Sequence, residues 1–265
     1  MIQVLEEASA IAKKHFGKVS GTVKAGDANQ VFTKTDLEIG TFIVSSLQKQ
    51  YPDHNVIEEE TGVIDKKSPY TWVVDPIDGT SNFISGIPMY GILVALLDNT
   101  MPIVGAVSMP EFGEVYFAEK GKGAYCNEKR LHVTREDKLM NALVAYGIDA
   151  HQENPTTTHD ECRVLGDIIL HVRNIRASNS VFDYMMVAKG NYGAYLNRTT
   201  KIWDNAAPQL IIEEAGGVYT DFFGKPIDYS NPLKKSNENF TFCTAAPQLH
   251  KQLQSIIHGE RDEKS

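Results

Sequence analysis

The chain contains 265 residues, of which 42% are hydrophobic, so it is long enough to bury one large core or two modest ones. This composition excludes a disordered chain and a disulfide-stapled mini-protein. The 26 basic residues against 34 acidic ones give a net charge of -8, and the basic doublets are scattered along the chain. Binding to nucleic acid through its phosphates is therefore not expected.

Cysteine spacing and the amino-terminal segment indicate the compartment. Cys126, Cys162 and Cys243 lie far apart without a C-x-x-C pair, which argues against a zinc module, a redox motif or a disulfide framework. Glu6 and Glu7 fall where a signal peptide needs its apolar centre, and no segment approaches the ~20 apolar residues of a membrane span. We expect a cytoplasmic protein with no membrane partner.

The first half of the chain predicts two helices followed by a sheet. Apolar residues recur at helical spacing over residues 1–16, and a second helix starts near Thr33, with Asp36 in its first turn, and ends before Tyr51. The β-branched and aromatic run over residues 70–75 predicts a buried strand. From residue 91 to 134, apolar runs alternate with turn residues, which predicts an antiparallel meander without crossover helices.

The second half alternates strands with helices. Strands are expected over residues 142–146, 193–196 and 240–245, and helices over residues 160–173, 180–189, 205–215 and at the carboxyl end. Such alternation predicts a second mixed layer.

The segment from Trp72 to Phe83 carries the clearest chemical signal. It is a strand that leads into Asp75 and Asp78, three residues apart, and then into a helix start at Gly79 and Thr80. Two carboxylates held close together repel each other unless a divalent cation lies between them, and Mg²⁺ prefers such oxygen ligands. Backbone N–H groups at a helix amino terminus can hold a phosphate. The segment therefore places metal ligands next to a phosphate site.

Other interpretations of these motifs fit less well. Asp75 could simply end a strand while Asp78 caps a helix. A calcium loop needs acids at alternating positions, and haloacid-dehalogenase phosphatases have one residue between their aspartates where this chain has two. The run from Gly121 to Gly123 begins like a dinucleotide fingerprint but lacks the third glycine, so it indicates a turn.

Taken in order, the acidic motifs resemble those of the inositol monophosphatase family, Mg²⁺-dependent and lithium-sensitive phosphatases related to fructose-1,6-bisphosphatase. The family pattern W-[VI]-[VI]-D-P-[IL]-D-G-T-x-N-[FY] is matched from Trp72 to Phe83, and W-D-x-A-A is matched from Trp203 to Ala207. The family's G-E-E-S aligns with residues 58–61, where Glu58 replaces the glycine. The resemblance extends over nearly the whole chain.

The resemblance implies a set of site residues, which divides by role. The first metal site is implied at Glu59, Asp75 and the carbonyl of Ile77, and the second at Asp75, Asp78 and Asp204. The implied catalytic residues are Asp36, Glu59 and Thr80. The implied substrate-binding residues are Asp78, Gly79, Thr80, Ser180 and Asn197.

The family also implies a fold and a reaction. We expect an α+β chain folded as a layered αβαβα sandwich, with an N-terminal α+β half over residues 1–140 that bears most metal ligands. A C-terminal α/β half over residues 141–265 would contribute Asp204 and the leaving-group pocket. The implied activity is hydrolysis of a small soluble phosphomonoester, most simply inositol monophosphate, by a water activated by two or three Mg²⁺ ions. A homodimer is implied as well.

Several alternatives remain open on the sequence. The substrate could be fructose 1,6-bisphosphate, 3′-phosphoadenosine 5′-phosphate or histidinol phosphate, and the chain could be a non-catalytic metal-binding regulatory protein. Inositol-preferring members usually carry a glutamate where this chain has Asn197, followed by Arg198 and Lys201. Either these two basic residues are solvated, or the leaving-group pocket is adapted to a different substrate, such as one with a second anionic group.

Overall fold

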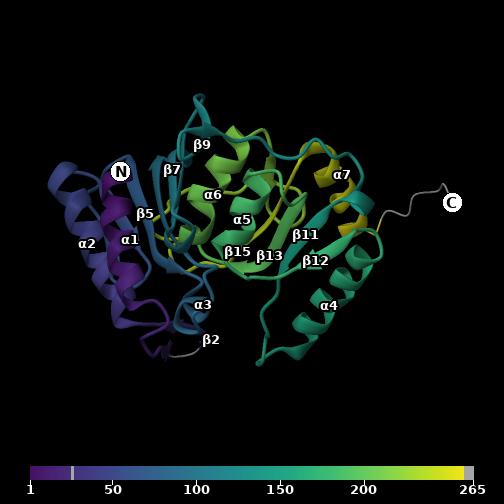
Figure 1. Cartoon of the computed structure of the whole chain (residues 1–265), viewed down its shortest axis with the longest axis horizontal. Helices are drawn as coiled ribbons and strands as arrows, with labels where there is room; N and C mark the ends of the chain where they lie inside the picture. The colour runs from purple at the N-terminus through teal and green to yellow at the C-terminus, as the bar shows by residue number, and fades with distance from the viewer. Residues whose placement is uncertain (25–26, 260–265) are drawn as a thin grey trace.

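The computed structural model describes residues 1–24 and 27–259, and these form five layers in the order helix, sheet, helix, sheet, helix (Figure 1). This is the αβαβα sandwich expected from the sequence. The last six residues of the predicted second half lie outside the described residues.

An eight-stranded sheet forms the second layer, and the outer helices α1 (Ile2–His15) and α2 (Lys34–Gln50) pack on it. Its neighbours pair antiparallel except β3 and β5, which run parallel. In spatial order the strands are β10 (Lys129–Arg130), β9 (Gly123–Cys126), β8 (Glu114–Glu119), β7 (Met101–Met109), β6 (Gly91–Asp98), β5 (Tyr70–Asp78), β3 (Asn55–Glu58) and β4 (Gly62–Ile64).

A five-stranded mixed sheet forms the fourth layer. Its strands in spatial order are β12 (Asn174–Arg176), β11 (Leu143–Gly147), β13 (Ala194–Thr200), β15 (Phe240–Ala245) and β14 (Val218–Thr220). Between the two sheets lie α5 (Val181–Ala188) and α6 (Ile202–Glu214), and α4 (Pro155–Ile169) and α7 (Pro247–Ile257) form the outer layer (Figure 1).

Short elements complete the chain. They are the hairpin β1 (Thr22–Lys24) and β2 (Asp27–Phe32), the short helix α3 (Thr80–Ile84) directly after β5, and the 3₁₀ turns η1 (Pro110–Phe112) and η2 (Leu139–Asn141).

Helix α6 belongs to the second half of the sequence but packs against the first sheet. A Cβ atom at Gly105 of β7 would lie 2.7 Å from the backbone oxygen of Ala207, so the absence of a side chain there lets helix and strand approach closely. One buried apolar cluster accordingly includes Leu93 and Val107 from the first sheet with Leu210 and Ile211 from α6. This packing joins the two halves and fixes the start of α6 at their junction.

The structure corrects some predicted element boundaries. Helix α6 begins at Ile202, so Asp204 lies in its first turn, whereas the sequence placed this aspartate just before the helix. Helix α4 begins at Pro155, a residue whose fixed φ suits a first helical position, rather than at residue 160. The strands of the β1–β2 hairpin, β12 and β14 were not predicted, because runs this short and polar carry no clear periodicity.

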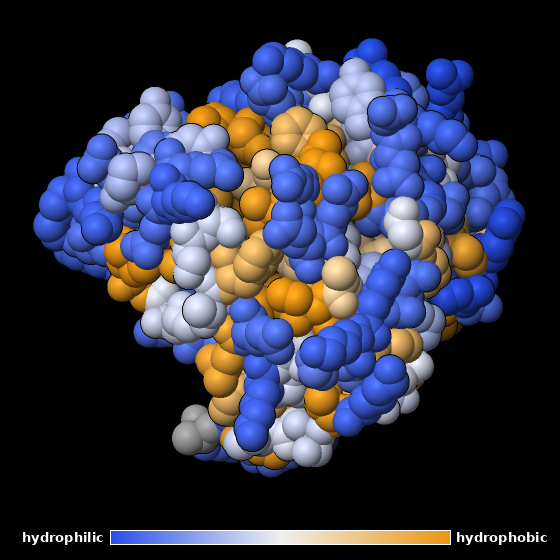
Figure 2. Space-filling model, turned by 60° about the vertical axis from the view of Figure 1, so that its left-hand side comes forward, coloured by the Kyte–Doolittle hydropathy of each residue, from blue (hydrophilic) through white to orange (hydrophobic). Residues whose placement is uncertain are grey.

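The surface is mostly polar on the face that comes into view when the left-hand side of Figure 1 is turned forward. Figure 2 shows hydrophilic residues covering this face, with hydrophobic residues exposed in several patches among them. Within the described residues no helix has both the length and the apolar character needed to cross a bilayer.

Candidate active site

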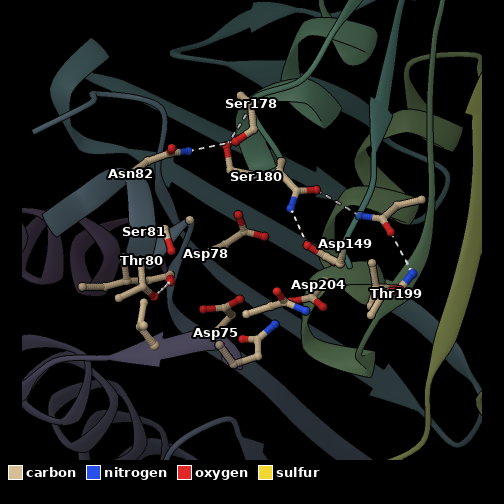
Figure 3. Close-up of a pocket in the computed structure, with 18 of the residues that line it drawn as sticks. Asp75, Asp78, Thr80, Ser81, Asn82, Asp149, Ser178, Ser180, Thr199 and Asp204 are labelled. Atoms are coloured by element: carbon tan, nitrogen blue, oxygen red, sulfur yellow. Dashed lines mark hydrogen bonds between the residues drawn. The ribbon is translucent and has the colours of Figure 1, made fainter. Parts of the chain in front are cut away.

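Three aspartates from two distant segments converge at the junction of the halves. Asp75 and Asp78 lie at the end of β5 and Asp204 lies in the first turn of α6, and one carboxylate oxygen of each lies within 4.8 Å of the others (Figure 3). Asp75 is only 2% exposed, and its Oδ1 is buried without a hydrogen-bond partner. An unpartnered buried carboxylate oxygen is unfavourable unless something positive meets it, so the donor set fits a divalent cation.

Burial raises the pKa of all three aspartates, and neighbouring acids raise those of Asp75 and Asp78 further. Burial, together with the charges of Glu59, Asp78 and Asp204, raises the pKa of Asp75 well above its usual range. Burial and the charge of Asp204 raise the pKa of Asp78 well above its usual range as well. Burial raises the pKa of Asp204 to about 6, although the Lys201 N–H donates to its carboxylate over 2.6 Å. Proton uptake relieves the repulsion when no cation is bound, and a cation would displace those protons.

Asp36 is completely buried and links two elements of the site. It lies at the third position of α2 in a capping box, where its Oδ2 accepts from the Thr33 N–H over 2.8 Å. Its Oδ1 faces Thr80, whose hydroxyl lies 3.2 Å away and also 2.9 Å from the carbonyl of Ile77. Asp36 and Thr80, which the family resemblance names as catalytic residues, are therefore in contact, and Asp36 completes the capping box of α2 at the same time.

The three consecutive glutamates 58–60 have different surroundings. Glu59 lines the pocket, and its Oε1 lies 2.7 Å from the Nζ of Lys24. Glu60 contacts the same lysine over 2.7 Å. Burial raises the pKa of Glu59 to about 8, while the charge of Lys24 opposes this rise. Of the three, Glu59 is the one that lines the pocket.

Glu58, which replaces a glycine of the family pattern, points away from the pocket into the protein. It is 1% exposed and accepts from the backbone N–H groups of Glu60, over 3.2 Å, and Thr61, over 2.6 Å. Its carboxylate fills the space beside Gly40 of α2, where a Cβ atom would lie 2.5 Å from its Oε1. Glu58 thus anchors the turn that presents Glu59.

The segment after β5 brings the remaining predicted residues against the second half. Gly79 has φ +86°, and a Cβ there would lie 2.9 Å from the Cβ of Ser180 and 3.0 Å from the carbonyl of Met89, so only glycine fits. Asp78 accepts from the N–H of Val181 over 2.6 Å. Ile77, Gly79, Thr80 and Ser180 all line the same pocket as the aspartates.

The far wall of the pocket contains residues that the sequence did not single out. Asn197 lines it as expected, and it is joined there by Asp149, Asn179 and Thr199 in a hydrogen-bonded row (Figure 3). Asn29 of the β1–β2 hairpin donates to the carbonyl of Ala150 over 2.8 Å and so bridges the two halves beside this wall. No local motif marks these residues, because loops and strand ends far apart in sequence supply them.

Known proteins with similar sequences and structures point to one family. The model of the inositol monophosphatase family matches residues 1–259. A fructose-1,6-bisphosphatase/inositol-1-monophosphatase of Aquifex aeolicus is 34% identical over 83% of each chain, and a protein named Nus factor SuhB of Haemophilus influenzae is 34% identical over 73% of each chain. The solved structure of an IMPase from Thermotoga maritima has a TM-score of 0.84 at 26% identity and covers 97% of this chain and 95% of its own.

The chain belongs to the inositol monophosphatase family. Family membership supports a phosphatase, that is, a hydrolase of phosphate esters, and the family is metal-dependent. The acidic cluster Asp75, Asp78 and Asp204 is in keeping with that dependence.

Proposed function

We propose that the chain hydrolyses a small phosphomonoester with Mg²⁺, and that inositol monophosphate is its first candidate substrate. One observation carries the proposal: the aspartate cluster lines one pocket together with Thr80, whose hydroxyl lies 3.2 Å from the buried Asp36. Carboxylates suited to a cation thus lie beside a hydroxyl that is anchored on a buried acid.

Two or three Mg²⁺ ions would bind in this proposal. Glu59, Asp75 and the carbonyl of Ile77 would hold one ion, while Asp75, Asp78 and Asp204 would hold a second. When bound, the ions would supply Lewis-acid stabilisation of the phosphoryl oxygens and lower the pKa of water. The Lys24 contact uses only Oε1 of Glu59, so the other carboxylate oxygen would be left to bind an ion.

The chain's own groups would orient the reactants. The Thr80 hydroxyl donates toward Asp36 or the Ile77 carbonyl, so its lone pairs remain able to accept from the attacking water. Asp36 would fix this orientation, since its other oxygen is held by Thr33. The backbone at Gly79 and Thr80 lies beside the aspartates and would hold the phosphate, and Ser180 and Asn197 would contact the leaving group.

The relatives' names support the reaction more than one substrate. Inositol monophosphate is favoured by the name of the bovine relative inositol monophosphatase 1, which is 30% identical over 91% of this chain. Fructose 1,6-bisphosphate is a second candidate, because the Aquifex aeolicus relative carries both names. A homodimer in the cytoplasm fits this proposal.

A phosphate-release assay tests the proposal. Wild-type protein is given inositol 1-phosphate, fructose 1,6-bisphosphate, 3′-phosphoadenosine 5′-phosphate, histidinol phosphate and p-nitrophenyl phosphate, with Mg²⁺ or with EDTA. We expect release that EDTA abolishes and that the Asp75→Asn variant loses. A matched control is Asp160→Asn, which changes an exposed acid of α4 and should keep wild-type activity. Absence of release from every ester would favour a non-catalytic metal-binding protein instead.

A further inference from the structure

The side chains that line the pocket include acids but, among the described residues, no base. None of the described residues that line the pocket is a lysine, an arginine or a histidine, although five of them are acids: Glu59, Asp75, Asp78, Asp149 and Asp204. Four of these acids are the proposed metal ligands. Asp149 is the acid that remains to face the leaving group.

The two basic residues that follow Asn197 do not supply the missing positive charge. The Nε of Arg198 lies 3.7 Å from the buried Glu161, and its guanidinium lies over the ring of Phe222, 5.4 Å from the centroid. Lys201 donates to the carbonyl of Asn237 over 2.8 Å. Both side chains therefore have partners outside the pocket, and a second phosphate would find no cationic side chain among the described lining residues.

A directed row of hydrogen bonds fixes Asp149 in the wall (Figure 3). The Thr199 N–H donates to Asn197 Oδ1 over 2.7 Å, and Asn197 Nδ2 donates to Asn179 Oδ1 over 3.3 Å. Asn179 Nδ2 then donates to Asp149 Oδ1 over 3.0 Å. The row places its only charge at Asp149, and each amide uses the carbonyl oxygen as acceptor and the NH₂ group as donor, which defines its orientation.

The surrounding backbone is built to hold this row. Asn179 has φ +53°, and the backbone N–H groups of Ser178 and Asn179 both donate to Asp183 Oδ2, over 2.9 and 3.1 Å. At Gly147, the end of β11, a Cβ atom would lie 2.4 Å from Asn197 Nδ2 and 2.5 Å from Asn179 Oδ1. The two amides thus occupy a space that exists because residue 147 is glycine.

We infer that Asp149 is a specificity-determining residue, which accepts hydrogen bonds from the leaving group and selects leaving groups that donate hydrogen bonds and carry no second phosphate. The inference depends on the proposed phosphatase function and names the substrate class of that site. Hydroxyl groups of a polyol and the ammonium of an amino alcohol share this chemistry, because both donate to a carboxylate. A second phosphate is repelled, since like charges close together in a partly desolvated pocket destabilise the complex.

The test compares esters within one enzyme. For wild type, Asp149→Asn and the control Asp160→Asn, kcat/KM is measured with Mg²⁺ on inositol 1-phosphate, histidinol phosphate, fructose 1,6-bisphosphate and p-nitrophenyl phosphate. The nitrophenyl ester has no hydrogen-bond donor on its leaving group and so reports the phosphoryl site alone. Asparagine at 149 can still accept from Asn179, so the row survives while the charge is removed.

We expect wild type to prefer the donor-bearing monoesters over the bisphosphate. In Asp149→Asn, kcat/KM on the preferred monoester should fall about tenfold relative to the nitrophenyl ester, as for loss of one charge-assisted hydrogen bond, mainly through KM. The value for the bisphosphate should rise. A larger loss of kcat/KM on histidinol phosphate would show that Asp149 accepts from an ammonium group. A larger loss on inositol 1-phosphate would show that it accepts from hydroxyl groups. Either result supports the inference.

Two results would overturn the inference while the proposed phosphatase function stands. If the kcat/KM ratios between the esters change by less than about twofold in Asp149→Asn, Asp149 does not discriminate between leaving groups. A wild-type preference for fructose 1,6-bisphosphate that persists in the variant would contradict the exclusion of a second phosphate. If even p-nitrophenyl phosphate releases no phosphate, the proposed function fails first, and the inference that depends on it fails with it.

Discussion

The two ends of the pocket are built in different ways. The aspartate end draws on a continuous segment, Asp75 to Thr80, which one strand and one short helix present together, and Asp204 completes it from α6. The leaving-group end is a row in which Asp149, Asn179 and Asn197 come from three separate segments. The first end is crowded with like charges, whereas the second balances a single carboxylate with amides.

We expect this difference to separate catalysis from substrate selectivity. The acids of the first end repel one another and lack a partner at Asp75 Oδ1, an arrangement that is unfavourable without a cation. The second end is held together by a row of hydrogen bonds between neutral amides and one carboxylate, although the Thr199 hydroxyl is buried without a partner, and it depends on close packing around Gly147. Changes at the first end should therefore affect all esters alike, and changes at the second should affect them unequally.

The largest effect is expected from Asp78→Asn, which tests the aspartate end. Turnover should fall by more than about a hundredfold on every ester, because a metal ligand is lost. The fold should persist, since the amide oxygen can still accept from the Val181 N–H and one repelling charge is gone. Phosphate release and circular dichroism measure the two effects. Activity above about a tenth of wild type would contradict the metal assignment.

Gly147→Ala should damage the leaving-group end selectively. The added Cβ would lie within 2.5 Å of both amides, so the row has to move. We expect kcat/KM on inositol 1-phosphate to fall about tenfold more than on p-nitrophenyl phosphate. The matched control is Gly166→Ala in α4, where nothing lies within 4 Å of the new atom and the helix should gain up to ~1 kcal/mol. An equal loss on both esters would argue for a general loss of stability.

Moving the carboxylate from residue 149 to residue 197 should have a smaller effect on activity. Asn197→Glu alone loses the Nδ2 donor to Asn179 and adds a second negative charge near Asp149, so we expect weaker activity on inositol 1-phosphate. The double variant Asp149→Asn with Asn197→Glu restores a single carboxylate and should recover several-fold over either single variant. Additive losses in this double-mutant cycle would show that the two positions act independently.

The smallest effect concerns stability without metal. Burial raises the pKa of Glu59 from 4.5 to about 8 and that of Asp204 from 3.8 to about 6. The folded chain then holds these protons more tightly than the unfolded chain, so their stabilisation is complete below about pH 4 and is lost as the pH rises toward 8. In EDTA the melting temperature should fall by a few degrees from pH 5 to pH 8.

Mg²⁺ should reverse this trend at the aspartate end. Binding to the folded state alone raises the melting temperature, and the rise should be larger at pH 8 than at pH 5.5 because bound protons no longer compete. Calorimetric scans of wild type and Asp75→Asn at both pH values measure it. An Mg²⁺-independent melting temperature in wild type would count against a metal site, whereas Asp149→Asn should leave the shift unchanged.

Much of the aspartate end could be predicted because its residues follow one another in sequence. Residues 72–83 contain a strand, a turn and a helix start, and local geometry alone brings Asp75, Asp78 and Thr80 to one place. The role of Glu58 could not be predicted in this way. Its burial depends on Gly40 in a different helix, and the sequence carries no signal that pairs the two residues.

The sequence by itself determined the family, because its contiguous motifs are local properties of the chain, and the layered fold followed from the resemblance to that family. Only the tertiary structure decided which carboxylate joins the amides of the far wall. Arg198 follows Asn197 directly, yet it contacts Glu161, whereas Asp149 reaches the same wall from the segment after β11. Neighbouring residues of a strand point to opposite faces, so Arg198 does not share the pocket wall with Asn197. The parallel pairing of β11 with β13 brings Gly147 opposite Asn197. Residues that are adjacent in sequence are therefore separated at this wall, and residues distant in sequence meet there.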